Sequence, residues 1–303
     1  MKRRTLLVLV AIVASACDGG GGSTGGAGDA AGATTGGGAG GGATVGGGGE
    51  GEGGVATGGG GGGAAGGLGS GGAPAGPGVT GVLEDEAGQP IGGASVLLCN
   101  TRVCYSDNTA ADGRFTFLCD AEVPVDFVVK SMEDAGTTPR RGVTMFPLRF
   151  LDAVTVDVGS LFVPALPAGA LLGPSSGDPQ VLEVGDGLQL TVNRADLAPP
   201  PGASLGDIAA RRIPPERVPP LLDLGGEEIV AVYALYPFAT TSGSPIAVQA
   251  PSDLTRGTPV RFRTLSEYDG ALSAPVAGEA DGAVVTTAPG AGIDELTWIV
   301  ISR

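Results

Sequence analysis

Two strand signals joined by a polar turn decide the fold: Val79-Thr80-Gly81-Val82-Leu83, then Glu84-Asp85-Glu86-Ala87-Gly88, then Gln89-Pro90-Ile91-Gly92-Gly93-Ala94-Ser95-Val96-Leu97-Leu98-Cys99. A hairpin follows through Asn100–Val103, and Asp112-Gly113 turns the chain into the alternating strand Arg114–Phe117. Asp-Gly beside alternating apolar residues is a strong hairpin signal. Further strands are expected at Val125–Lys130 and Val154–Val163. Short strands separated by turn residues predict an all-β sandwich over residues 79–165.

This segment resembles the carboxypeptidase regulatory-like domain family, whose fold is a transthyretin-like sandwich. The resemblance lies in two groups of residues: Gly81, Asp85, Gly88, Pro90, Ile91, Gly93, Ala94 and Val96, then Thr109, Asp112, Gly113, Phe115 and Phe117. Val156–Gly159 is similar to the family's closing strand, whereas Ala121–Phe127 replaces the family's Leu-Pro-x-Gly-x-Tyr stretch. The resemblance implies a non-catalytic module for stability, spacing or weak ligand contact, and it assigns no catalytic residue.

Alternation along the strands separates the cysteines. In the family pattern three residues face the core: Ala94, Val96 and Leu98. Cys99 therefore points outward. Cys104 lies across a four-residue loop, at a distance that a disulfide accepts. Cys119 is in phase with the inward phenylalanines of its strand and is expected to be a buried thiol. We predict a Cys99–Cys104 disulfide, and pairing of Cys119 with either of the other two remains the alternative.

A second module is expected over residues 166–303, after the boundary Leu166-Pro167-Ala168-Gly169. Val181–Val184 and Leu188–Val192 predict a hairpin, and Leu205–Arg212 is interpreted as a short helix that ends before Pro214. The remaining strands are predicted at Ile229–Tyr236, Ile246–Ala250, Val260–Leu265, Ala283–Thr287 and Leu296–Ile301. About 138 residues suffice for one core, so a second β-sandwich-like module is predicted.

Residues 17–78 are a glycine-rich tract. They hold most of the 58 glycines of the chain and almost no bulky apolar side chain. Such a composition cannot bury enough surface to offset the entropy of ordering the backbone. The sequence therefore predicts a disordered linker that separates the folded modules from an anchor.

The anchor is expected at the N-terminus. Lys2, Arg3 and Arg4 precede an apolar run from Leu6 to Ala14. This run is about half of the ~20 residues that a membrane-spanning helix needs, so residues 1–16 are interpreted as a signal peptide. Arg3-Arg4 also suggests a twin-arginine signal as an alternative.

Ala14-Ser15-Ala16-Cys17 resembles the lipobox of bacterial lipoproteins. The resemblance implies that Cys17 is acylated, that the leader is cleaved before it, and that the lipid bilayer is a partner. The alternative is an ordinary secretory signal cleaved after Ala16. Asp18 resembles an inner-membrane retention signal of enteric bacteria, but we favour the outer membrane or cell surface of a bacterial envelope.

The charged residues limit the chemistry. The chain has a net charge of −15 and no histidine. These properties disfavour a nucleic-acid partner and exclude catalysis that needs an imidazole. Acidic pairs occur at Glu84/Asp85/Glu86, Glu133/Asp134, Glu227/Glu228 and Asp294/Glu295. We interpret them as solvated turns, and we expect no catalytic, cofactor or metal site.

The sequence thus predicts a membrane-anchored lipoprotein of the cell envelope that displays two non-catalytic β-sandwich modules for structural or binding roles. Its further partner would be an envelope protein or a polysaccharide. The alternative function is an accessory carbohydrate-binding component of a polysaccharide-processing system. Sugar sites need exposed aromatic platforms, and the candidates outside Tyr105 are Tyr233, Tyr236, Tyr268 and Trp298.

Overall fold

A computed structural model describes residues 77–132, 137–175 and 177–303. Strands make up the regular structure of these residues, with two short 3-10 helices, η1 (Arg194–Asp196) and η2 (Pro215–Arg217), between them. The predicted all-β class is therefore confirmed. The predicted signal peptide, Cys17 and the glycine-rich linker lie outside the described residues.

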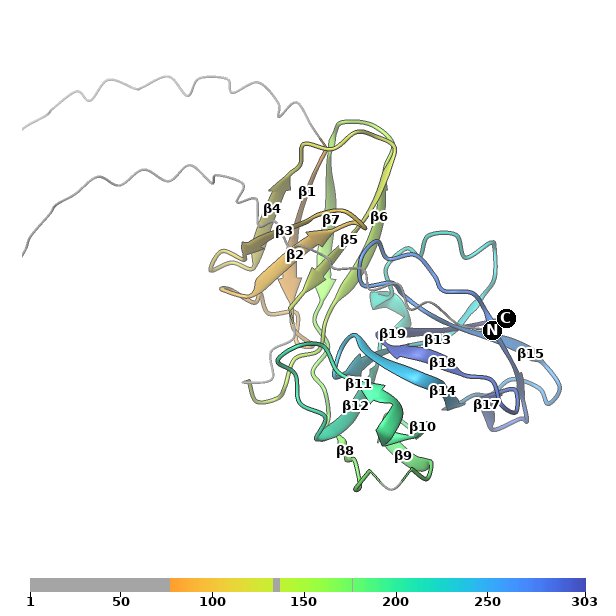
Figure 1. The fold of residues 1–303 in the computed structure, drawn as a ribbon. Helices are drawn as coiled ribbons and strands as arrows, with labels where there is room; N and C mark the ends of the chain where they lie inside the picture. The colour runs from red at the N-terminus through yellow and green to blue at the C-terminus, as the bar shows by residue number, and fades with distance from the viewer. Residues whose placement is uncertain (1–76, 133–136, 176) are drawn as a thin grey trace, which may run out of the picture. The chain divides into compact units, whose positions relative to one another are not determined.

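The first module consists of strands β1–β7, which run from orange to yellow-green in Figure 1. Their bounds are β1 (Gly78–Glu84), β2 (Ser95–Cys99), β3 (Cys104–Asn108), β4 (Arg114–Leu118), β5 (Val125–Ser131), β6 (Met145–Phe150) and β7 (Thr155–Phe162). They form a three-stranded sheet in the order β4-β1-β7 and a four-stranded sheet in the order β3-β2-β5-β6. One apolar core, which includes Phe115, Phe127 and Phe150, joins residues of both sheets. The predicted sandwich is thus present.

Glycine is needed at the Asp112-Gly113 turn. Gly113 has a φ of +75°, and a Cβ atom there would lie 2.8 Å from the carbonyl oxygen of Leu83. The Gly113 carbonyl accepts a hydrogen bond from the Leu83 amide. Only a residue without a side chain lets the β3–β4 turn approach β1 so closely.

The second module consists of strands β8–β19, coloured green to blue in Figure 1. Their bounds are β8 (Ala170–Leu171), β9 (Gln180–Gly185), β10 (Leu188–Val192), β11 (Leu197–Ala198), β12 (Asp207–Arg212), β13 (Ile229–Tyr236), β14 (Thr240–Pro251), β15 (Pro259–Thr264), β16 (Val276–Ala280), β17 (Val284–Thr287), β18 (Ile293–Leu296) and β19 (Trp298–Ser302). They belong to one 12-stranded sheet, whose main path runs β8-β12-β13-β19-β15-β16-β17-β14-β10-β9.

This large sheet folds over, so that strands from its two ends meet. The amide of Arg212, at the end of β12, donates to Asp186 Oδ2 in the β9–β10 turn at 2.7 Å. Side chains from both halves of the sheet, including Leu190, Val248, Tyr233 and Ile299, form one core. The second module therefore has the predicted sandwich character.

The predicted helix at Leu205–Arg212 is wrong. Residues Asp207–Arg212 form strand β12, which pairs antiparallel with β13. Ile208, Ala209 and Ala210 are all fully buried. Alanine has the highest helix propensity of the residues, but this propensity is small in energy, and hydrogen bonding to β13 together with burial on both faces outweighs it.

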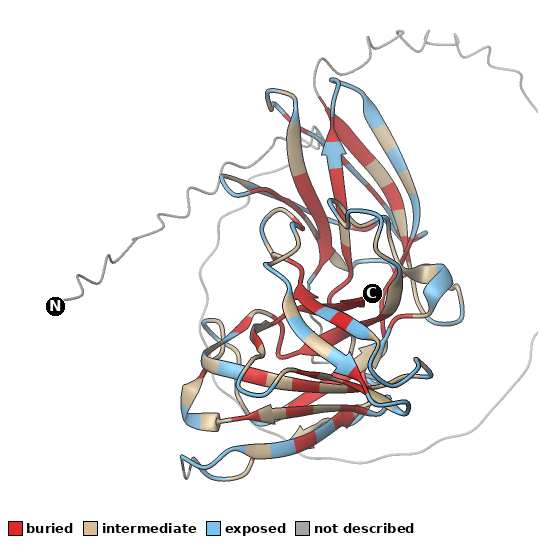
Figure 2. Cartoon of the chain, turned by 90° about the vertical axis from the view of Figure 1, so that its right-hand side faces the viewer, coloured by how far each residue is buried: buried red, intermediate tan, exposed pale blue. Residues whose placement is uncertain are grey.

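The two modules share a third core. Side chains alternate along β13 and β19: Tyr233 and Ile299 enter the core of the second module, whereas Val232 and Val300 point to the opposite face. That opposite face packs against first-module residues, among them Val128. β19 is buried along its whole length, and Figure 2 shows the strand that ends at the C-terminus in red. The modules are therefore joined by a continuous apolar contact.

Trp298 anchors this shared core. Its indole Nε1 donates a 2.8 Å hydrogen bond to the carbonyl oxygen of Val143 in the first module, and its side chain is 1% exposed. This bond gives the carbonyl of Val143, a residue that is 3% exposed, a donor from the second module. Together the ring and the bond tie β19 to the segment that enters β6.

We predict that Trp298→Phe lowers the free energy of unfolding by about 1–3 kcal/mol, because the Val143 carbonyl loses its donor while an aromatic ring is retained. Urea unfolding of the full-length protein measures this change. The matched control is Tyr268→Phe, which alters an exposed ring and should stay within about 0.5 kcal/mol of the wild type. Equal stability of the two variants would contradict the anchoring role of Trp298.

Candidate functional site

A disulfide closes the β2–β3 hairpin. Cys99 and Cys104 are directly opposite in the register, their Cα atoms are 4.0 Å apart, and their sulfur atoms are bonded. The predicted pair is therefore confirmed. Cys119 is 4% exposed and lies in the core of the first module, as its phase with Phe115 and Phe117 predicts.

The environment of Cys99 differs from the prediction. Alternation is correct, since Val96 and Leu98 enter the first-module core and Cys99 lies on the opposite face. That face is not solvated, however. Cys99 is fully buried in the shared core, because the second module covers the outer face of β2. Of the three described cysteines, Cys104 is the exposed one.

A hollow of about 690 Å³ opens beside this hairpin. Its walls come from the 100–103 loop, the segment 120–126 and Asp269 of the second module. The polar groups include Asn100 and Arg102, as well as the carboxylates of Asp120 and Glu122. Tyr105 contributes an aromatic wall. Backbone pairing places the hairpin loop, and the disulfide holds its two strands together.

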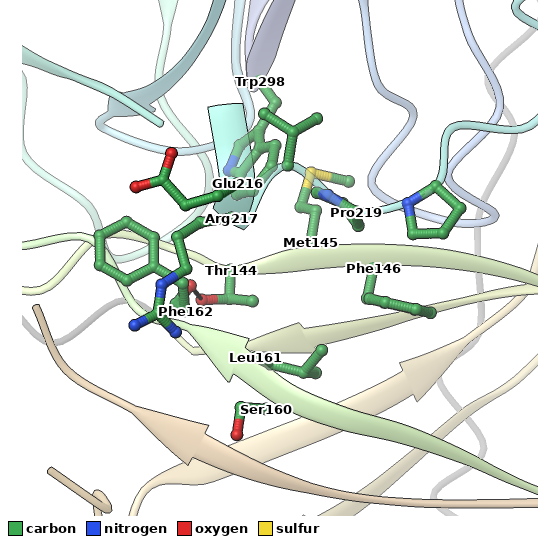
Figure 3. A pocket seen from close by; sticks show the side chains of 12 residues that line it. Thr144, Met145, Phe146, Ser160, Leu161, Phe162, Glu216, Arg217, Pro219 and Trp298 are labelled. Atoms are coloured by element: carbon green, nitrogen blue, oxygen red, sulfur yellow. Dashed lines mark hydrogen bonds between the residues drawn. The ribbon is translucent and has the colours of Figure 1, made fainter. Parts of the chain in front are cut away.

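A smaller cavity of about 270 Å³ lies where the two modules meet (Figure 3). Strands β6 and β7 form one side, and η2 with the prolines that follow it forms the other. Of its two charged lining residues, Glu216 and Arg217, the second is paired. Arg217 Nη1 lies 3.6 Å from Glu84, which also accepts a 2.7 Å hydrogen bond from Ser160 Oγ. The guanidinium also lies 5.9 Å from the centre of the Phe162 ring. These contacts serve to hold η2 against the first module.

A buried cation links the modules at a second place. Lys130 is 7% exposed, and its Nζ donates to the carbonyl oxygen of Glu267 at 2.9 Å and to Glu267 Oε2 at 3.2 Å. The ammonium group also lies 5.7 Å from the centre of the Phe238 ring. Burial, followed by repulsion from Glu267 and Asp294, raises the pKa of Glu295 to about 7, although Lys130 opposes this shift. Two carboxylates thus compete for one lysine.

Other acidic pairs carry structural roles. Glu227 accepts hydrogen bonds from Arg261, Arg263 and Ser302, at 2.6–2.9 Å. The bond from Arg263 and then that from Ser302 lower the pKa of Glu227 to about 2. The prediction of a solvated turn is wrong for Glu227, whose side chain is 16% exposed. Asp85 does cap a turn, because it accepts from the Ala87 and Gln89 amides. Glu133 and Asp134 lie outside the described residues.

The candidate aromatic platforms are mostly buried. Tyr233, Tyr236 and Trp298 are at most 9% exposed, whereas Tyr268 is 55% exposed. Tyr268 lies next to Asp269, which lines the hollow. Of the candidate tyrosines, Tyr105 lines the hollow, whereas Tyr268 is exposed but is not part of its lining.

No group of three metal-ligating side chains that could hold a metal ion occurs within the described ranges. Among the same residues, none of the helices has the length and apolar character required to cross a bilayer.

The carboxylates around Lys130, those of Glu267 and Glu295, predict that the stability of the protein depends on pH. The pKa of Glu295 is raised on folding, so its protonated form stabilises the fold, and this contribution is lost as the pH rises through 7. Glu295→Gln should match the wild type near pH 5 and melt at a higher temperature at pH 8. Glu183→Gln, an exposed carboxylate far along the sheet, is the control. A melting-temperature difference that is the same at both pH values would contradict the prediction.

Comparison with known proteins returns no match, either to a protein-family model or to a curated protein. The resemblance to carboxypeptidase regulatory-like domains therefore stays a hypothesis that rests on the residues quoted above.

Proposed function

We propose that the protein is an exported lipoprotein of the bacterial cell envelope, anchored by acylated Cys17, and that its two β-modules act as a non-catalytic display head. The supporting observation is the continuous apolar contact between the modules, because a head that behaves as one body keeps its surfaces in a fixed arrangement. The Cys99–Cys104 disulfide adds support, since disulfides persist in oxidising compartments such as the envelope.

In this proposal the lipid chains provide attachment to the bilayer, and residues 17–78 separate the head from it. Two or three acyl chains hold a protein on a membrane far more firmly than one. The separation would let the head reach an envelope protein or polysaccharide. Outer membrane or cell surface is the proposed location.

A second candidate function is carbohydrate binding. It is favoured by the large polar hollow beside Tyr105, to which Asp269, the neighbour of the exposed Tyr268, also contributes. A short sugar chain could rest on an aromatic face while its hydroxyl groups bond to the surrounding side chains.

Lipid attachment predicts that Cys17→Ser abolishes metabolic labelling with palmitate and releases the protein from the membrane fraction. The control is the double variant Cys99→Ser/Cys104→Ser, which keeps Cys17 and should still be labelled. Labelling and fractionation of Cys17→Ser like those of the wild type would refute the lipoprotein proposal.

The one-body head predicts that the first module is not stable by itself. A chain that ends at residue 165 would expose Val128, Val143 and Met145, which are at most 3% exposed in the complete head. Each large apolar side chain that loses its cover forfeits about 1.5–3 kcal/mol. We expect this fragment to aggregate or to melt well below residues 77–303 in calorimetry. Cooperative melting of both at one temperature would show that the modules are independent.

A further inference from the structure

We propose that the hollow beside the disulfide-linked hairpin binds a neutral polyhydroxylated ligand, namely a short oligosaccharide. This inference rests on the second candidate function and names its site and ligand class. The volume of about 690 Å³ falls within the roughly 300–1,000 Å³ of small-ligand sites. Both modules contribute to the walls, so the complete head is needed to form it.

A buried amide supplies the hydrogen-bond donor. Asn100 lines the hollow and is only 9% exposed. Its Oδ1 accepts hydrogen bonds from the Arg102 and Val103 amides, both at 2.8 Å, which fixes the side-chain orientation. Its Nδ2 group makes no hydrogen bond to any residue that the structure describes. Nδ2 is not one of the buried side-chain atoms that lack a partner, so it is accessible at the surface of the hollow and can donate to water or to a ligand oxygen.

Carboxylate hydrogen-bond acceptors lie on the other wall of the hollow. Asp120 and Glu122 are exposed, line the hollow, and form no ion pair with any described side chain. Asp126, in contrast, is held by Arg149, whose Nε and Nη2 donate at 2.6 and 2.8 Å. The hollow therefore combines an oriented amide donor with two carboxylates, Asp120 and Glu122, that form no ion pair with a described side chain, and Arg102 is the cation in its lining.

An aromatic wall completes the site. The Tyr105 ring packs against Phe127 with 6.3 Å between the ring centres, which limits the orientations that it can take. A ring held in this way offers an apolar face with a polar tip. The apolar C–H face of a sugar ring fits such a surface.

Hydroxyl groups fit this mixture better than other ligand chemistries. Anions are disfavoured because three carboxylates of the lining, those of Asp120, Glu122 and Asp269, face one lining cation, Arg102, while Asp126 is already paired with Arg149. The carboxylates do not converge as metal ligands among the described residues. A basic peptide side chain only donates hydrogen bonds, so it would leave the Asn100 amide unsatisfied. A hydroxyl group both donates and accepts, and so it satisfies the amide and the carboxylates together.

Calorimetric titration of the full mature chain with soluble trisaccharides (maltotriose, cellotriose, xylotriose and chitotriose) tests the proposal. Binding of at least one is expected. Asn100→Asp retains Oδ1 for the loop but removes both N–H donors, and should weaken that binding about tenfold, as expected for one lost hydrogen bond. Glu122→Gln, at an exposed position, should also weaken it. Glu183→Gln, in the second module away from the hollow, should have no effect.

Thermal melting of each variant shows whether it is folded, and Glu122→Gln remains informative if Asn100→Asp is not. The proposal is overturned if none of the four sugars binds at millimolar concentration, or if both hollow variants bind as the wild type does. Binding of penta-lysine in place of the sugars, weakened in Glu122→Gln, would also overturn it. Palmitate labelling is independent of these titrations, so failure here would leave the anchored display head standing.

Discussion

The rest of the structure depends on one apolar contact, in which the outer face of a first-module strand is buried against the outer face of second-module strands. β5 in the first module and β13 and β19 in the second carry apolar side chains on both of their faces. A strand of that kind cannot leave either face in water without a large loss of hydrophobic free energy. Each module therefore covers an apolar surface of the other that would be costly to expose to water. Trp298 adds a hydrogen bond to this contact.

This constraint explains the polar groups at the joint. Lys130 lies on β5 just beyond Val128 and Val129, and is carried with them out of the solvent. A buried ammonium needs a partner, and Glu267 of the second module provides one. Glu84 and Arg217 meet in the same way at the edge of the smaller cavity. Ion pairs at such positions specify how the modules are matched, whereas the apolar contact provides most of the stability.

Much of the fold could be predicted from the sequence, but less of the candidate site could be. Turn residues and alternation located most of the longer strands of both modules, although not β6 or β16. They also placed Cys99 opposite Cys104 and Cys119 inside. These are local properties, which depend on neighbours in the chain. The helix predicted at Leu205–Arg212 failed because pairing with β13 is a long-range interaction.

The covered faces could have been recognised from the sequence. Phe127-Val128-Val129 is a continuous apolar run, and so is most of Ile229–Tyr236. Such runs are typical of strands buried on both faces, whereas a sandwich exposed on one side shows alternation. Asn100, Glu267 and the hollow leave no comparable signal, because residues far apart in the chain create them.

The position of β19 in the sheet has a consequence for biogenesis. This strand lies between β13 and β15, at the middle of the large sheet, yet it follows both of them in the chain. Until residues 298–302 have left the ribosome or a translocation channel, β13 and β15 have no strand between them and both cores that meet at β19 are incomplete. The large sheet of the second module therefore cannot be completed before β19 has been synthesised. A nonsense mutation a few codons upstream of residue 298 would remove the strand that joins both cores, and the truncated product would be expected to unfold and to be degraded by proteases.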